Sequence, residues 1–136
     1  MVFLWISITA LGVCAIVFIV LVAKEHAPSP DDVAVAYERA WDRFDFATLW
    51  ELSGPELRDG RDRNAFVAAK RAAYADQTAL HGLVHSVTAS TLSLDPESAI
   101  VVTTLVTDTP PSIRNQCTLA RRGGRWFVVN YAHAAQ

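Results

Sequence analysis

The chain has 136 residues, 51% of them hydrophobic, and its 12 basic and 14 acidic side chains give a formal net charge of −2. This balance excludes the basic patch or stripe by which nucleic-acid-binding domains hold phosphates, so we expect no nucleic-acid partner. The two cysteines, Cys14 and Cys117, form no disulfide framework, and the length beyond residue 23 allows one ordinary domain but not two.

No charged side chain occurs in the first 23 residues, and Lys24 follows them directly. About 20 apolar residues, at about 1.5 Å each, cross the roughly 30 Å hydrocarbon core of a bilayer. The pattern predicts a transmembrane helix over 1–23, with Trp5 at one membrane interface and Lys24 at the other. A cleaved export signal is disfavoured because no basic residue precedes Lys24. Lipidation at Cys14 is disfavoured because Val13 is not the small residue that lipoprotein signals place there.

The basic residues nearest this run all follow it, at Lys24, Arg39 and Arg43. Because basic residues are retained on the cytoplasmic side, we expect a single-pass protein of the cell membrane, N-terminus outside and domain in the cytoplasm. Small side chains on one stripe of the span would let another membrane helix approach closely, namely Ser7, Ala10 and Cys14. We therefore expect integral membrane protein subunits and the lipid bilayer as partners.

A linker is predicted over 24–30, where Pro28 and Pro30 interrupt any helix, and a single domain over 31–136. Ser29 before Pro30 is typical of a helix start, and apolar residues at helical spacing extend this first helix to about Phe44. Its acidic residues are interpreted as the solvent-exposed side of the helix: Asp31, Asp32, Glu38 and Asp42.

Two shorter helices are predicted next, one capped by Asp45 and ending before Ser53, the other over about 64–74. From residue 83 the apolar period changes from 3.6 to 2, which predicts four strands joined by turns rich in Asp, Pro and Gly. Their predicted ranges are 84–94, 100–107, 113–121 and 126–132. Three helices followed by an antiparallel meander indicate an α+β domain, with the helices covering one face of a curved sheet.

Two stretches of the chain resemble NTF2-like domains, the cone-shaped cystatin-like fold. The first resembles the opening helices of that family: Ala40, Trp41, Phe44, Asp45, Phe46, Leu49, Trp50, Leu52, Ser53, Pro55, Glu56 and Leu57. The second resembles its closing strand: Gly124, Arg125, Trp126, Val128 and Val129. The resemblance covers about residues 31–133, and it leaves open whether the domain pairs with a second copy through its sheet.

Enzymes of that family place Asp, Tyr or His side chains inside the cone to move protons. Here His85 is the ionisable proton carrier inside a predicted strand, Asp108 and His133 lie at strand ends with Tyr131 close by, and Tyr37 is placed to point into the cone. No matched acid and base pair is visible. We therefore expect no catalytic residue and no enzyme activity from the chain alone, and interpret His85 as a surface or partly buried strand residue.

Metal and cofactor sites are not expected either. His81 and His85 are four residues apart, which suits zinc on a helix, but at the entrance of a strand that separation is about 13 Å. Cys117 is interpreted as an inert buried thiol. The cluster of Arg114, Arg121, Arg122 and Arg125 would suit anionic lipid headgroups, but is interpreted as solvated.

The predicted function is that of a non-catalytic, single-pass accessory subunit of a larger membrane complex, whose soluble domain is an interaction or stabilising module. The run from residue 1 to 24 with the domain behind it resembles the single-span accessory subunits of cytochrome c oxidase in actinobacterial respiratory supercomplexes, which implies no haem or copper in this chain. One alternative is a membrane-tethered module that binds a small apolar molecule through Tyr37, Trp41 and Phe44. Another is an exported protein that assists envelope transport.

Overall fold

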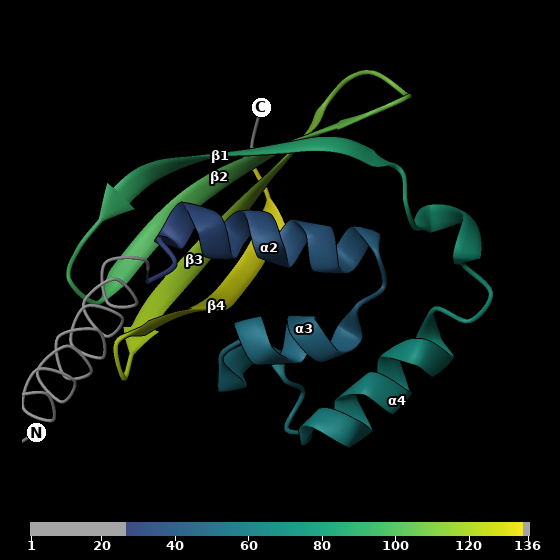
Figure 1. The fold of residues 1–136 in the computed structure, drawn as a ribbon, viewed down its shortest axis with the longest axis horizontal. Coiled ribbons are helices and arrows are strands. Elements are labelled where there is room, and N and C mark those ends of the chain that lie inside the picture. Colours follow the sequence, from purple (N-terminus) through teal and green to yellow (C-terminus); the bar gives the residue numbers. More distant parts are fainter. Residues whose placement is uncertain (1–26, 135–136) are drawn as a thin grey trace, which may run out of the picture.

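The structure, a computed structural model, describes residues 27–134 (Figure 1). The α-helices are α2 (Pro30–Asp42), α3 (Phe46–Leu52) and α4 (Arg63–Ala73), and two 3-10 helices are η1 (Pro55–Leu57) and η2 (Thr78–Leu80). The strands are β1 (Val84–Leu94), β2 (Ser98–Thr107), β3 (Ile113–Arg122) and β4 (Arg125–His133). The predicted α+β class is confirmed: three helices precede a four-stranded antiparallel sheet.

The sheet is a meander in which each strand pairs with the next one along the chain. Its register aligns Thr103 of β2 with Asn115 of β3, and Asn115 with His133 of β4. One step along the sheet, Cys117 of β3 pairs with Tyr131 of β4. Side chains two residues apart on a strand share a face, so this register brings polar side chains from three strands together near one end of the sheet.

The helix starts follow from capping residues close to the predicted positions. The Ser29 hydroxyl accepts a hydrogen bond from the Asp32 amide (3.1 Å), and the Asp32 carboxylate accepts one from the Ser29 amide (2.9 Å), which forms a capping box. Asp45 caps α3 through the amide of Thr48 (3.1 Å). Asp62 caps α4 through the Ala65 amide (2.8 Å), so α4 begins one residue before the predicted start at Asn64.

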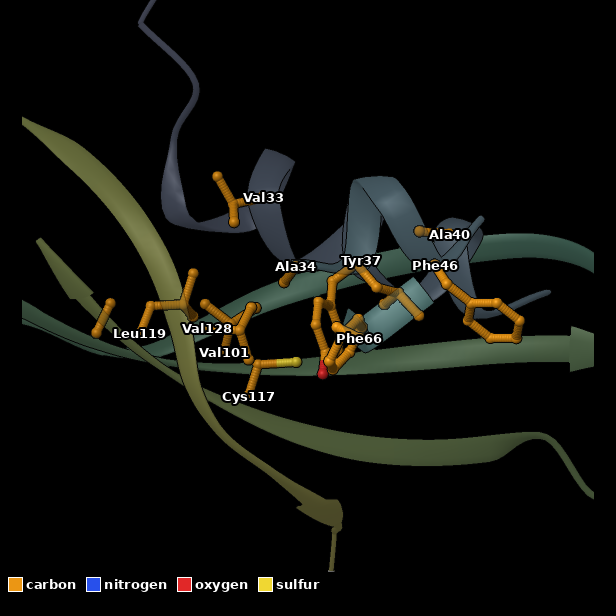
Figure 2. Packing of buried hydrophobic residues seen from close by; sticks show 12 residues of the cluster. Val33, Ala34, Tyr37, Ala40, Phe46, Phe66, Val101, Cys117, Leu119 and Val128 are labelled. Carbon is orange, nitrogen blue, oxygen red and sulfur yellow. The ribbon is translucent and has the colours of Figure 1, made fainter. Parts of the chain in front are cut away.

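The core lies between one face of the sheet and the helices α2 and α3. Figure 2 shows side chains from α2 on one side and from β2, β3 and β4 on the other, directed toward the same interior. Their buried members from α2 are Val33, Ala34, Tyr37 and Ala40, and those from the strands are Val101, Cys117, Leu119 and Val128. Helix α4 packs against α3 rather than across the sheet, so α2 is the main cover of this face.

Helix α2 is too short to cover the whole sheet. Its 13 residues extend about 20 Å, whereas the 10 residues of β2 extend about 33 Å. In Figure 1 the C-terminal end of α2 lies below the start of β1, and the segment through η2 connects α4 to β1 at the right of the view. The end of the sheet where β2 leads into β3 therefore extends beyond the cover of the helix.

The predicted membrane span, with Trp5, Ser7, Ala10, Cys14 and Lys24, lies outside the described residues. Among residues 27–134 no helix has the length and apolar character needed to cross a bilayer. The longest of them, α2, has 13 residues, against about 20 for a span. This finding contradicts the predicted single-pass localisation with a cytoplasmic domain, which depended entirely on the charge-free run at the N-terminus.

Candidate functional site

A cavity of about 450 Å³ occupies the end of the sheet that α2 leaves uncovered. Its walls come from the last turn of α2, from the segment between α4 and β1, and from the adjoining ends of β2, β3 and β4. The lining residues are Glu38, Trp41, Asp42, Phe44, Tyr74, Leu80, Leu83, Val84, Leu105, Thr107, Ile113, Asn115, Tyr131 and His133. This volume is within the range of sites that hold a small organic molecule.

At the base of the cavity lies the carboxylate of Glu38, whose residue is 1% exposed. One oxygen, Oε1, accepts hydrogen bonds from Thr103 Oγ1 (2.6 Å) and Asn115 Nδ2 (3.0 Å). The other, Oε2, accepts one from the Tyr131 hydroxyl (2.8 Å). Burying a carboxylate costs several kcal/mol unless such donors replace its water. All three donors are neutral, so no cation in the described part of the chain compensates the charge.

These contacts define a single direction for each hydrogen bond in the network. A carboxylate accepts only, so the amide nitrogen of Asn115 faces Glu38, and its second N–H donates to the Tyr131 oxygen (2.7 Å). The Asn115 carbonyl oxygen then faces His133 Nδ1 at 2.9 Å, so Nδ1 carries the proton and donates. In neutral His133 the remaining nitrogen, Nε2, is an acceptor at the rim of the cavity.

The buried carboxylate also affects nearby acids. Burial, and then the charge of Glu38, raise the pKa of Tyr131 well above its ordinary value, so this hydroxyl stays a neutral donor. The same two causes raise the pKa of the Cys117 thiol to about 12. Burial raises the pKa of Tyr37 as well, although the neighbouring Trp41 and Ser53 side chains oppose the rise. None of these three groups is ionised near neutral pH.

Aromatic rings form the opposite wall of the cavity. Phe44 lies 5.4 Å from Tyr74 and 5.5 Å from His81, and Trp41 lies 5.8 Å from Tyr74, measured between ring centroids. Phe44 turns the chain between α2 and α3 with a φ of 53°, a conformation that side chains of this size rarely adopt. The indole nitrogen of Trp41 is buried and has no hydrogen-bond acceptor among residues 27–134.

Large apolar side chains surround the mouth of the cavity and remain exposed. Leu80 is 55% exposed, Leu83 46% and Ile113 42%. Asp42 holds this part of the chain in place, because its Oδ1 accepts hydrogen bonds from the amides of Leu83 (2.8 Å) and Val84 (3.0 Å). Exposed apolar residues around a hollow indicate a surface that an apolar occupant would cover.

The structure places two of the three predicted ligand-binding residues in this wall. Trp41 and Phe44 line the cavity, whereas Tyr37 is 4% exposed and packs behind it, with its ring edge-on to Tyr131 at 5.2 Å. Their role in binding a ligand stays a prediction.

The other singled-out side chains lie apart from the cavity or at its margin. His85 is exposed, with Nε2 2.7 Å from Asp108 Oδ1, while His81 contacts Phe44 instead. No group of three His, Cys, Asp or Glu side chains in the described range is arranged to hold a metal ion. Cys117 is fully buried in β3, and Arg122 pairs with Glu56 (Nη1 to Oε2, 3.0 Å).

Glu38 was expected on the solvent-exposed side of α2, and this expectation is wrong because the residue is buried. Its neighbours show the reason for the error: Ala34 lies four residues before it and Trp41 three residues after it, on the same face of the helix. Asp42, assigned to the same exposed side, lines the cavity. A carboxylate in register with an apolar stripe was the available signal for both residues.

Comparisons with known proteins support the fold but give no family. No family model and no curated protein matches the chain. Among solved structures, the chain is similar to RPA3114, a SEC-C motif containing protein from Rhodopseudomonas palustris, with 18% identity over 85% of this chain and 87% of that chain, and a TM-score of 0.50. At this level of identity the likeness concerns the fold alone.

These comparisons contradict the resemblance to NTF2-like domains and to oxidase accessory subunits, along with the respiratory role that the latter implied. The physical reason lies in the residues that suggested it. Phe46 and Leu49 are buried core residues, Asp45 is a helix cap, and Val128 is a buried strand residue. Any domain that packs short helices on a curved sheet needs such residues, so they do not distinguish one family from another.

Proposed function

We propose that the domain binds a small, largely apolar organic molecule in the cavity between α2 and the end of the sheet. The observation that supports this most is the combination of a cavity of about 450 Å³ with apolar residues exposed at its mouth and a buried carboxylate at its base. Binding sites for small molecules have this composition, a mostly apolar wall with a few fixed polar groups.

The polar network favours binding over proton transfer. Both oxygens of Glu38 already accept hydrogen bonds from neutral donors: Tyr131 donates to Glu38, and Asn115 donates both to Glu38 and to the Tyr131 oxygen. Such a network holds a charge in a fixed position. The prediction that the chain is not an enzyme stays a prediction, as does its predicted role as an accessory interaction module, because no partner is present in the structure.

The test is a pair of substitutions on exposed apolar residues of similar size. Ile113→Trp places a large side chain at the mouth of the cavity, where Ile113 is 42% exposed. Val106→Trp is the matched control, because Val106 is 45% exposed and follows the lining residue Leu105, so its side chain is on the opposite face of β2.

Ligand binding is measured by nitrogen-15 NMR titration of the full chain with small aromatic compounds. We expect shifts at the amides of cavity residues in the unmodified chain and in Val106→Trp, and at least a tenfold loss of affinity in Ile113→Trp. Equal affinity in the two variants, or shifts confined to residues away from the cavity, would overturn the proposal.

A further inference from the structure

The charged side chains that line the cavity are acidic. Two of its residues, Glu38 and Asp42, are acidic, and none of its described lining residues is Lys or Arg. Lys70 of α4 is not a lining residue, although its ammonium lies 5.8 Å from the Trp41 ring centroid, and it pairs with Asp59 at 3.5 Å. A carboxylate shielded from water, such as that of Glu38, acts more strongly than one on the surface, so together with Asp42 it favours a cation and opposes an anion.

Apart from the Trp41 indole and the Tyr74 hydroxyl, the side-chain hydrogen-bonding groups still available in the described wall are acceptors. Thr103, Asn115 and Tyr131 use their donors inside the Glu38 network, and the Thr107 hydroxyl donates to the Thr109 carbonyl (3.1 Å). His133 Nδ1 donates to Asn115, which leaves Nε2 as an acceptor. Asp42 uses Oδ1 for two backbone amides, and its second oxygen has no hydrogen bond from residues 27–134. A ligand that donates hydrogen bonds fits this arrangement.

The aromatic wall adds a second preference for positive charge. Trp41, Phe44, Tyr74 and Tyr131 all line the cavity. The electron-rich faces of such rings attract ammonium groups, and more strongly when water is excluded. The same rings pack against the apolar body of a ligand, so a single molecule can use both properties.

Building on the proposed function, we propose that the ligand is an organic cation: a molecule with an apolar, preferably aromatic body and a protonated amine. The amine lies within the field of Glu38 and Asp42 and donates to the free acceptors of the wall, and the body packs against the aromatic rings. Anionic ligands such as carboxylates and phosphates are disfavoured, because no Lys or Arg lines the wall and its free side-chain donors are only the buried Trp41 indole and the Tyr74 hydroxyl.

The test uses three ligands with one indole body and different charges: tryptamine, tryptophol and indole-3-acetate. Affinities for the full chain are measured by NMR titration at pH 7 and low ionic strength. We expect tryptamine to bind at least tenfold more tightly than tryptophol, and indole-3-acetate to bind most weakly. Raising the salt concentration narrows the difference between tryptamine and tryptophol, because it screens the carboxylates near the mouth.

Two variants remove the charges while keeping the shape. Glu38→Gln and Asp42→Asn each reduce the preference for tryptamine over tryptophol by at least threefold and leave the affinity for tryptophol within twofold of its original value. If Glu38→Gln fails to fold, as a thermal melt would show, Asp42→Asn and the ligand series still decide the result. The surface variant Asp95→Asn is the control and leaves the preference unchanged, because Asp95 is exposed in the turn between β1 and β2, at the other end of the sheet from the cavity.

The outcomes separate this inference from the proposed function. If tryptophol or indole-3-acetate binds in the cavity as tightly as tryptamine, the preference for cations is wrong while small-molecule binding stands. An unchanged preference in Asp42→Asn and in folded Glu38→Gln likewise overturns the inference. If none of the three ligands shifts a cavity amide at millimolar concentration, both proposals fail together.

Discussion

Glu38 is stable in the interior because three neutral donors replace the water that its carboxylate would otherwise bind. The donors come from β2, β3 and β4, so the charge of one helix residue is tied to three strands at once. Losing one donor leaves part of a buried charge unsatisfied, which is more costly than losing an ordinary hydrogen bond. The contribution of each donor to folding can therefore be measured one residue at a time.

Tyr131→Phe tests this contribution. It removes the hydroxyl that donates to Glu38 Oε2 and accepts from Asn115, and we expect the free energy of unfolding to fall by about 1–3 kcal/mol. Tyr74→Phe is the control, because the Tyr74 hydroxyl forms no hydrogen bond among the described residues, and it should change stability by less than about 0.5 kcal/mol. Urea titration measures both values. Equal values for the two variants would contradict the role assigned to the Glu38 network.

At the scale of elements, the mouth of the cavity depends on one residue at the end of α2. The Asp42 carboxylate accepts from the amides of Leu83 and Val84, and its backbone carbonyl accepts from the Gly82 amide at 2.7 Å. Gly82 has a φ of 73°, which lets the chain turn sharply toward β1. The three contacts attach the segment before β1 to the helix, and so hold the walls of the cavity together.

Asp42→Ala should release this segment. Without the acceptor, we expect amide hydrogen exchange at Leu83 and Val84 to become at least tenfold faster, while exchange in the middle of β2 changes little. Asp42→Asn keeps an acceptor oxygen in the same place and should retain most of the protection. Hydrogen exchange followed by NMR distinguishes the variants. Unchanged exchange at both amides in Asp42→Ala would show that other contacts hold the segment.

Elements could be predicted from the sequence much better than the cavity. Caps and turns act locally, so Ser29, Asp45 and the Gly123–Gly124 turn indicate their elements without reference to the rest of the chain. The cavity depends on distant events: the register that aligns Thr103, Asn115 and His133, and the rotation of α2 that turns Glu38 inward. Neither is encoded in a short window, which is why the carboxylate was assigned to the solvent-exposed side.

For the whole molecule, the apolar and polar parts of the interior occupy different lengths of the same sheet. The apolar cluster around Val33, Leu119 and Val128 lies where the first turns of α2 cover the strands. The polar network and the cavity lie near the end of α2, where the cover becomes incomplete. Weak acids that ionise only at high pH occur in both regions: Tyr37 and Cys117 in the apolar cluster, and the half-buried Tyr131 in the polar network.

These buried acids predict a loss of stability at alkaline pH. Each has a pKa in the folded chain above its ordinary value, for Cys117 about 12 compared with 9.0, and raised for both tyrosines from 10.0. A raised pKa means that the unfolded chain loses its proton first, so the stability is fully present below about pH 9 and falls as pH rises further. The slope is about 1.4 kcal/mol per pH unit for each group that ionises only after unfolding.

Cys117→Ala isolates one of these contributions. The variant should be less stable at pH 7 because it leaves a small void in the core, but its stability should fall less steeply between pH 9 and 11 than that of the unmodified chain. Urea midpoints across this range give both slopes. The charge of Glu38 raises the pKa of Cys117 and of Tyr131, so the stability of a folded Glu38→Gln variant should also fall less steeply with pH. If stability falls with the same slope in the unmodified chain and in both variants, the buried charge does not control ionisation in the core.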